Sequence, residues 1–345
     1  MKRLAAILLF FLVTGAIFLG ILTWARRGEA RREQERPAQA VLEVATDLPA
    51  DLAEAAGDAF EKESGIIVNV TAVTSADLLS GAFPGGKQPD AVLSSQEVLQ
   101  ELRRKKELLP YMSQRTDIVL DAYKDREGCW TGLFMDPLVL AVNEDFAKKR
   151  DHYRYTWEGI MVDHSAALSM TDVVASSMAA DFLFSLAEHF GPDGAMARLR
   201  AAGTHMVQYG KYLSTPSRMA AMGKCDIGIS SYNEARRTEK EGLPLTIIYP
   251  DDGSPYYLYG AGITAGSRHP ERAGAFIDWL LSDLSYQKEL GERGYHYLYV
   301  NDIHFPADGR GKYLSLWNLD KVYYEDGKKD LVNRWIHEIR FRNKE

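Results

Sequence analysis

The sequence predicts an α/β fold built of two lobes, and three observations support this. Short apolar runs alternate with amphipathic segments, which is typical of a parallel sheet with helices packed on it. The alternation begins at residue 41 and begins again at residue 166. Four apolar runs end in small polar residues that open a helix, at residues 46–47, 94–95, 176–177 and 230–232. Two such blocks imply two lobes, joined by two chain crossings, with a cleft between them.

The first block gives the elements of one lobe. Residues 41–45 form a short apolar strand, and residues 50–63 carry apolar side chains at helical spacing until Gly65 ends the helix. Residues 66–73 are rich in β-branched side chains and complete a βαβ unit, which indicates a parallel sheet. We expect a strand at 91–93, a helix at 96–108 with a basic outer face, and a strand at 138–143.

The second block repeats the pattern. We expect strands at 166–170, 227–229 and 257–264, and helices at 177–189, 216–222, 233–241 and 270–281, followed by a mixed tail at 317–341. The crossings fall near Asn143 and near residues 245–262. We therefore assign residues 41–142 and 246–300 to lobe 1, residues 143–245 to lobe 2, and residues 301–345 to a C-terminal tail that packs on the lobes.

The N-terminus predicts a membrane anchor. Residues 4–24 are free of charge and follow Lys2 and Arg3, and a run of this length spans a bilayer as a helix. The A-x-A site nearest to this run, at residues 38–40, lies too far from it for ordinary signal cleavage. Residues 1–25 are thus interpreted as an uncleaved transmembrane signal anchor, and residues 26–40 as a polar linker. Five arginines follow the run, which argues for retention of the body in the cytoplasm.

Composition excludes several functions. The chain carries a net charge of −7, but residues 1–40 carry +4, so the remaining body is at −11 and would repel nucleic acid. The eight histidines show no zinc-ligand spacing, so neither a metal site nor a cofactor is predicted. Cys129 and Cys225 are distant in sequence; a disulfide is permitted, but two idle thiols are favoured. We expect a monomer.

The sequence offers no catalytic motif. It lacks a phosphate-binding loop of the form G-x-x-x-x-G-K-[ST], and residues 260–266 miss the dinucleotide spacing G-x-G-x-x-G. It also lacks a G-x-S-x-G nucleophile elbow, so Ser230 and Ser231 are not obvious nucleophiles. Binding rather than catalysis is predicted, although an enzyme acting on a phosphoester through the cleft serines stays an alternative.

The four polar junctions predict a ligand site. Each one brings backbone N–H groups, a hydroxyl or carboxylate, and the positive end of a helix dipole to one spot, although each can also be a simple helix cap. Ligands of α/β sheets bind beyond the carboxyl ends of the strands. We therefore expect an anionic small molecule to bind at a set of nine residues: Thr46, Asp47, Ser94, Ser95, Ser176, Ser177, Ser230, Ser231 and Tyr232.

Several segments, taken together, resemble the solute-binding proteins of ABC importers. These are residues 44–47 (VATD), 60–65 (FEKESG), 89–93 (PDAVL), 130–132 (WTG) followed by Pro137 and Asn143, and 262–281 (GITAGSRHPERAGAFIDWLL). They look like the type 2 periplasmic-binding fold group that handles ferric iron, 2-aminoethylphosphonate and hexose phosphates. The resemblance implies two lobes that close on a ligand by hinge bending.

The resemblance also extends the predicted site. Ser176 and Ser177, Ser214 and Thr215, and Ser230 resemble the turns that bind phosphate or a synergistic anion, and Thr171, the residue after the strand at 166–170, joins the set. The iron-binding branch has two adjacent tyrosines where this chain has Tyr232 and Asn233, and an acidic ligand where it has Ser94 and Ser95. Ferric iron prefers hard anionic oxygen ligands. An organophosphate or phosphonate is therefore favoured over iron(III) with a bound anion.

The resemblance implies an extracytoplasmic receptor that is anchored to the cytoplasmic membrane and delivers its solute to an ABC permease. A second interpretation is that the same module presents its ligand to a membrane sensor kinase. The uncleaved anchor makes that interpretation more plausible than it is for a free periplasmic protein. Neighbouring permease and ATPase genes would favour transport, whereas histidine kinase and response regulator genes would favour sensing.

Overall fold

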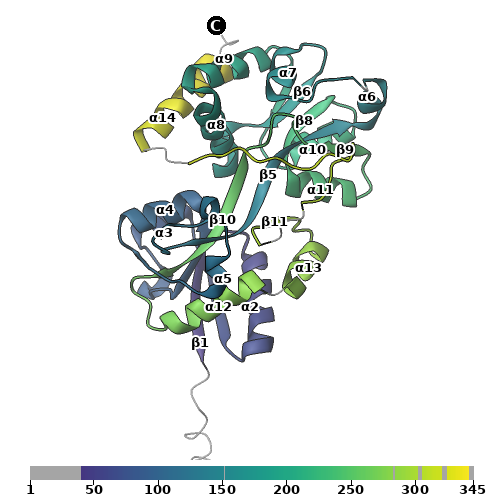
Figure 1. The fold of residues 1–345 in the computed structure, drawn as a ribbon. Helices are drawn as coiled ribbons and strands as arrows, with labels where there is room; N and C mark the ends of the chain where they lie inside the picture. Colours follow the sequence, from purple (N-terminus) through teal and green to yellow (C-terminus); the bar gives the residue numbers. More distant parts are fainter. Residues whose placement is uncertain (1–39, 151, 283, 302–304, 321–324, 342–345) are drawn as a thin grey trace, which may run out of the picture.

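The computed structural model describes residues 40–150, 152–282, 284–301, 305–320 and 325–341. Two α/β lobes lie one above the other in Figure 1, and two strands, β5 (Thr131–Asn143) and β10 (Tyr256–Thr264), run along the line that joins them. Hydrogen bonds connect the strands in the order β2-β1-β3-β10-β5-β8-β6-β7. The predicted two-lobed α/β architecture is therefore confirmed.

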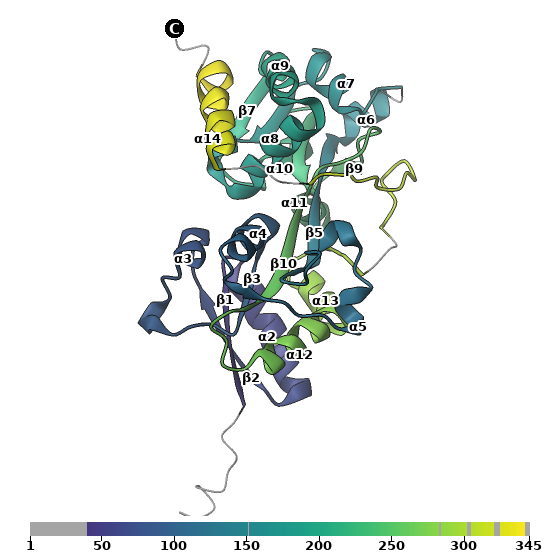
Figure 2. The same cartoon turned by 60° about the vertical axis from the view of Figure 1, so that its left-hand side comes forward.

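Lobe 1, the lower lobe of Figures 1 and 2, is built on β1 (Val41–Thr46), which pairs in parallel with β2 (Ile67–Ala72) and β3 (Ala91–Ser95). Strand β10 runs antiparallel to β3 and carries the short β4 (Leu108–Leu109) on part of its length, while β11 (Leu298–Tyr299) pairs with β5. The helices of this lobe are α2 (Ala50–Ser64), α3 (Ser75–Ser80), α4 (Gln96–Arg104), α5 (Gln114–Asp117), α12 (Pro270–Ser282) and α13 (Leu284–Glu292).

Lobe 2 is built on β6 (Leu168–Thr171), which lies in parallel between β7 (Met206–Gly210) and β8 (Ile227–Ser231). The second half of β5 runs antiparallel to β8, and β9 (Leu245–Ile248) pairs with the same half. The helices of this lobe are α6 (Glu144–Lys149), α7 (Trp157–Val162), α8 (Ser177–Phe190), α9 (Pro192–Ala202), α10 (Thr215–Ala221), α11 (Tyr232–Lys240) and α14 (Glu325–Arg334).

Strand β5 passes from one lobe to the other. Pro137 is the last residue that pairs with β10, and Leu138 is the first that pairs with β8. The residues expected to form a strand at 138–143 are thus the second half of a longer strand, and the lobe boundary that we expected at residue 142 lies near its far end. The second crossing is the segment 249–255 between β9 and β10.

The C-terminal tail returns to lobe 2 after β11. The N–H of Gly309 donates to the carbonyl of Ile247, and the indole N–H of Trp317 donates to the carbonyl of Asp252. Trp317 also stacks on His189 at the end of α8, with ring centroids 3.9 Å apart. Beyond α14, Trp335 is fully buried in the hydrophobic core of lobe 2. The tail is therefore an integral part of this lobe.

Several expectations of secondary structure need correction. The helix expected at 96–108 ends at Arg104, because Lys106 adopts a left-handed backbone conformation with φ of 63° and Leu108 enters β4. The elements that were not foreseen are helices α3, α5, α6, α7, α9 and α13 and strands β4, β7, β9 and β11. Strand β7 escaped notice because Val207 and Gln208 in its middle are exposed, so it shows no buried apolar run.

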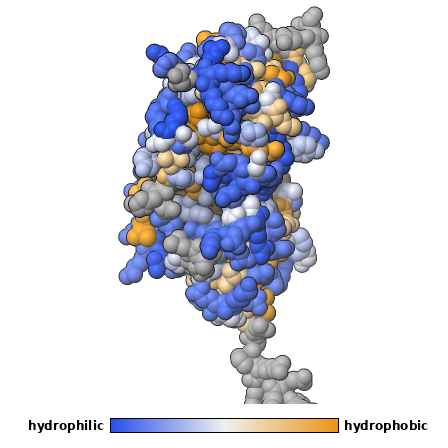
Figure 3. All heavy atoms as spheres, turned by 90° about the vertical axis from the view of Figure 1, so that its right-hand side faces the viewer, coloured by the Kyte–Doolittle hydropathy of each residue, from blue (hydrophilic) through white to orange (hydrophobic). Residues whose placement is uncertain are grey.

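The predicted anchor and nearly all of the polar linker lie outside the described residues. Within the described ranges, no helix combines the length and hydropathy that a membrane span needs. Cys129 in lobe 1 and Cys225 in lobe 2 are both buried and free, and burial raises the pKa of each thiol. One long side of the molecule, shown in Figure 3, is mostly hydrophilic with hydrophobic residues in small groups.

Gly228 on β8 sets how closely α10 approaches the sheet. A Cβ atom at this position would lie 2.3 Å from the carbonyl oxygen of Pro216, a backbone atom that cannot move independently. We expect Gly228→Ala to destabilise the protein by about 3 kcal/mol, the upper end of the usual range for overpacking. Thermal unfolding measures this loss.

Gly291→Ala is the matched control, because its Cβ would meet nothing within 4 Å on helix α13. That change should leave stability equal or slightly higher, since alanine favours helices. A melting temperature of Gly228→Ala equal to that of the wild type would contradict the packing described here.

Candidate functional site

The strand ends of the two lobes supply the polar junctions that the sequence singled out. Three of them are helix caps: the hydroxyls of Ser95, Ser176 and Ser231 accept hydrogen bonds from the N–H groups of Val98, Ala179 and Glu234, respectively. The simple capping interpretation therefore holds for these three hydroxyls. Because these hydroxyls already cap their helices, a ligand could be held only by the positive end of each helix and by the neighbouring polar groups.

At the first junction, in lobe 1, the polar groups bond to one another. Thr46 is fully buried, and its hydroxyl donates to the carbonyl of Leu93 and accepts from the N–H of Leu48. The carboxylate of Asp47 accepts hydrogen bonds from the hydroxyls of Ser94 at 2.7 Å and Ser75 at 2.6 Å. Helix α2 starts later, at Ala50, and has no side-chain cap. This junction is a bonded network that lies beside Ser95.

Tyr257 connects the two lobes at the second and third junctions. It lies on β10, and its hydroxyl donates to the hydroxyl of Ser177, the first residue of α8, at 3.2 Å. It also bonds to the hydroxyl of Ser95 at the start of α4, while burial raises its pKa. The structure thus brings together Ser95 of lobe 1 and the exposed Ser177 of lobe 2, two of the residues expected at the ligand site, around a tyrosine that was expected in the strand at 257–264.

The remaining lobe 2 residues lie at the carboxyl ends of β6 and β7. The hydroxyl of Thr171 donates weakly, at 3.5 Å, to the carbonyl of Tyr212. Ser214 precedes α10 without capping it by its side chain, and Thr215 begins that helix. Ser214 and Thr215 are partly exposed. They share the sheet edge of Thr171, but they are not among the residues that line the cavity described below.

The fourth junction points at a carboxylate of the protein itself. Asp136 of β5 is fully buried, and its carboxylate accepts from the N–H of Asn233 at 2.9 Å, from the N–H of Tyr232 and from the hydroxyl of Ser231. The positive end of α11 thus already holds a carboxylate. Burial raises the pKa of Asp136 to about 7. Tyr232 is buried with its hydroxyl bonded to Tyr249, and Ser230 is buried with an unpaired hydroxyl.

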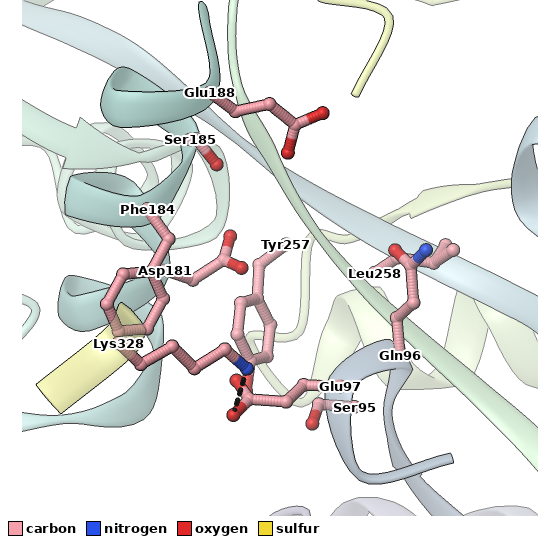
Figure 4. Close-up of a pocket in the computed structure, with 10 residues that line it drawn as sticks. All are labelled: Ser95, Gln96, Glu97, Asp181, Phe184, Ser185, Glu188, Tyr257, Leu258 and Lys328. Carbon is pink, nitrogen blue, oxygen red and sulfur yellow. Dashed lines mark ion pairs between the residues drawn. The ribbon is translucent and has the colours of Figure 1, made fainter. Parts of the chain in front are cut away.

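Side chains of both lobes enclose a small cavity between α4, α8, β10 and α14 (Figure 4). Its free volume is about 20 Å³, which is room for a single water molecule. A larger solute therefore enters only when the lobes move apart. The cavity is lined by Ser95, Gln96, Glu97, Asp181, Phe184, Ser185, Glu188, Tyr257, Leu258 and Lys328.

Two buried polar atoms at this cavity have no hydrogen-bond partner. They are the side-chain carbonyl oxygen of Gln96, in lobe 1, and the hydroxyl of Ser185, in lobe 2. Gln96 is 6% exposed and Ser185 is 2% exposed. An unpaired buried polar group costs free energy, and native proteins keep few of them. The unpaired atoms of Gln96 and Ser185 line one cavity from opposite lobes. They therefore indicate a place where a ligand supplies the missing hydrogen bonds.

The cavity is acidic with one basic group. Glu97, Asp181 and Glu188 contribute carboxylates, and Lys328 contributes an ammonium that lies 2.5 Å from a carboxylate oxygen of Glu97. These carboxylates accept hydrogen bonds, as does the free oxygen of Gln96. The starts of α4 and α8 contribute backbone N–H groups to the same region. The arrangement suits a molecule with several hydroxyl donors and one anionic group.

Other hollows and clusters of the described residues lie elsewhere. One hollow of about 580 Å³ lies between α2, α5 and α12, and another of about 590 Å³ lies beside α3, both on lobe 1 alone. Asp125, Glu127 and Cys129 have the spacing of metal ligands, but Arg103 pairs with both carboxylates. The cavity between the lobes is the candidate functional site because two unpaired buried groups, of Gln96 and Ser185, line it.

The family follows from comparison with known proteins. A family model described as bacterial extracellular solute-binding protein matches residues 43–288. The chain belongs to this family. A curated protein of Haemophilus influenzae, without an assigned function, is 23% identical to this solute-binding protein over 242 residues, which are 67% of this chain and 70% of that one.

Solved structures confirm the fold of this solute-binding protein. The periplasmic binding protein AfuA from Actinobacillus pleuropneumoniae, solved with fructose 6-phosphate, is 21% identical with a TM-score of 0.68, and the match covers 88% of this chain and 99% of that one. Iron-bound HitA from Pseudomonas aeruginosa is 16% identical with a TM-score of 0.65 and the same coverage. Solute-binding proteins are not enzymes, in agreement with the absence of a catalytic motif from the sequence.

The structure adds cavity residues that the sequence analysis missed. Gln96, Asp181, Ser185 and Glu188 lie on helices that were predicted, but the faces of those helices could not be assigned to a cleft without the position of the other lobe. Lys328 lies in a tail without clear periodicity. A usable signal was the polar Ser185 on the otherwise apolar inner face of α8 in this solute-binding protein.

The raised pKa of Asp136 predicts a pH dependence of stability. Its carboxyl group holds a proton more tightly in the folded state than in the unfolded state, where the pKa is 3.8. Stability from this group is complete below pH 4 and falls as pH rises towards 7, by on the order of 4 kcal/mol. Chemical unfolding between pH 4 and pH 8 measures the slope.

Asp136→Asn should flatten this slope, because an amide does not titrate and its carbonyl can still accept from the N–H groups of α11. The exposed Asp58→Asn is the control and should keep the wild-type slope. A residual slope in the variant is expected from Glu234, whose pKa burial also raises. Identical slopes for the wild type and Asp136→Asn would show that the group is not buried as described.

Ser185 offers a test of the cavity. Removing an unpaired buried hydroxyl should cost little, so Ser185→Ala should leave the free energy of unfolding within about 0.5 kcal/mol of the wild type while it weakens solute binding. Ser169→Ala is the matched control, because the buried hydroxyl of Ser169 donates to the carbonyl of Gln208. That change should cost about 1 kcal/mol of stability and leave affinity unchanged. If Ser185→Ala lowered stability and left solute binding unchanged, Ser185 would not belong to the binding site.

Proposed function

We propose that this solute-binding protein captures a hydroxyl-bearing organic oxyanion, an organophosphate or phosphonate, in the cavity between its lobes and delivers it to an ABC permease. The observation that carries the proposal is that unpaired Gln96 and Ser185, from opposite lobes, line one cavity together with three carboxylates and one lysine. Residues 1–25 would tether the protein to the outer face of the cytoplasmic membrane.

The charges of the cavity support a solute with both hydroxyl and anionic groups. Inorganic phosphate would meet Glu97, Asp181 and Glu188 with at most two hydroxyl donors of its own. A sugar-like body offers hydroxyl donors to the carboxylates of Asp181 and Glu188 and to the oxygen of Gln96. Its phosphate or phosphonate can then accept from the N–H groups at the start of α8 and from Lys328. Fructose 6-phosphate, the ligand of AfuA, has both kinds of group.

Iron(III) is the weaker candidate. Ferric iron needs anionic oxygen ligands, and a tyrosine must lose its proton to become one. Burial raises the pKa of both Tyr232 and Tyr257, so the phenolate form is disfavoured at each. The hydroxyl of Tyr232 also bonds to Tyr249. Among the described residues, the group with the spacing of metal ligands includes Cys129 and lies away from this cavity.

Delivery requires release, and the fold offers a route for it. The lobes share β5 and are joined again by the segment 249–255 and by the tail that leads from β11 to lobe 2, so they can bend apart at these three crossings. A cavity as small as this one indicates a closed arrangement of the lobes. Solute would bind when they are apart and would be enclosed when they close.

A thermal-shift screen tests the proposal. The ligands are fructose 6-phosphate, glucose 6-phosphate, 2-aminoethylphosphonate, inorganic phosphate and ferric citrate. A ligand present at about 100 times its dissociation constant should add about 2.7 kcal/mol to the free energy of unfolding. We expect stabilisation by a hydroxyl-bearing phosphate or phosphonate, with Ser177→Ala weakening it.

Fructose without phosphate is the control and should stabilise much less. Stabilisation by ferric citrate without any response to phosphorylated or phosphonated compounds would favour the iron alternative and reject the proposed solute class. Release of inorganic phosphate from fructose 6-phosphate would contradict a purely binding role.

A further inference from the structure

We infer that Lys328, on the C-terminal helix α14, is the cation that binds the oxyanion of the solute, and that Glu97 holds it in place while the cavity is empty. The inference rests on the proposed function and assigns a specificity-determining residue to its site. Helix α14 lies beyond residues 43–288, the part of the chain that matches the family model. Lys328 therefore lies in a part of the chain that the family model does not cover.

The geometry places Lys328 inside the site. Its side chain is 15% exposed, and its ammonium lies 2.5 Å from a carboxylate oxygen of Glu97 and 5.4 Å from the ring centroid of Phe184 on α8. Figure 4 shows the side chain reaching along Phe184 towards the start of α4. An ammonium with three donors and a flexible stem can follow a ligand oxygen as the lobes move.

The partner of Lys328 belongs to the opposite lobe. Glu97 is the second residue of α4 in lobe 1, whereas α14 packs on lobe 2. Any separation of the lobes pulls this ion pair apart. Glu97 is 39% exposed and lies in the first turn of its helix, where the helix dipole stabilises a carboxylate. Glu97 can therefore release Lys328 at small cost.

The solute oxyanion is a natural replacement for Glu97. Lys328 is the one basic residue among the described residues that line the cavity. It lies in the same cavity as the unpaired atoms of Gln96 and Ser185, which indicate independently that a ligand belongs there. A phosphate or phosphonate that enters between the lobes meets Lys328 in competition with Glu97, and a charge-assisted hydrogen bond favours the anion that approaches best.

A different role for the pair would be a latch that only holds the lobes together. The two roles predict opposite effects for one substitution. If Glu97 competes with the solute, Glu97→Gln frees Lys328 and affinity rises or stays equal. If the pair is a latch, Glu97→Gln weakens closure and lowers affinity, just as loss of Lys328 does.

The experiment measures dissociation constants by calorimetry for the full chain and its variants. The probe is the tightest binder among fructose 6-phosphate, 2-aminoethylphosphonate and inorganic phosphate. We expect Lys328→Met to weaken it by at least about tenfold, since a hydrogen bond to a charged group is lost. Lys329→Met, the exposed neighbour on the same helix, is the matched control and should bind as the wild type does.

Three outcomes overturn the inference. Equal affinity of Lys328→Met and Lys329→Met overturns it and leaves the proposed function intact. Loss of affinity in both Lys328→Met and Glu97→Gln replaces it with the latch. If the wild type binds none of the probes, the proposed function fails and the inference fails with it. If Lys328→Met does not fold, Lys328→Gln is measured in its place. If neither variant folds, the direction in which Glu97→Gln changes the affinity decides between the two roles.

Discussion

The structure depends on one strand that serves two lobes. Strand β5 is buried along nearly its whole length, and its partners change from β10 to β8 between Pro137 and Leu138. Pro137 is paired with Tyr256, but proline has no N–H to donate, so the backbone offers one donor fewer where the partners change. Asp136, one residue earlier, holds the start of α11 by three hydrogen bonds. The crossing therefore combines a bendable backbone with a fixed attachment of lobe 2.

This crossing decides which helix starts are left for a ligand. Asp136 occupies the positive end of α11, so Ser231 and Tyr232 serve the internal structure of the protein. The starts of α4 and α8 face each other across Tyr257 instead, where its hydroxyl bonds to Ser95 and Ser177. The four similar junctions of the sequence thus differ in the structure. Those at Ser95 and Ser177 meet at the cleft, the one at Asp47 is a bonded network, and the one at Ser231 is occupied by the buried carboxylate of Asp136.

The sequence predicts the elements well and the site in part, for a physical reason. Apolar periodicity reports which face of an element is buried, so β1, α2, β8 and α12 appear at nearly their predicted bounds. It does not report which element of the other lobe lies opposite, and that decides whether Ser185 or Glu188 faces a cavity. Ser231 and Asp136 lie far apart in sequence, so their bond could not be foreseen either. Ser95 and Ser177 could be proposed from the sequence because strand ends and helix starts are local features.

The tail changes the electrostatics of the site. Without it, the cavity would contain Glu97, Asp181 and Glu188 and no basic side chain, and the body of the chain is already strongly acidic. A lysine can bring one charge into such a place because its stem packs on apolar surface while its ammonium stays at a polar group. Here the ammonium lies over the ring of Phe184 and pairs with Glu97. Trp335 anchors the same tail in the core of lobe 2, so this charge moves with lobe 2. A cation fixed to one lobe and balanced by a carboxylate on the other couples the charge of the cavity to its opening, because each opening movement exposes Lys328 to an incoming anion.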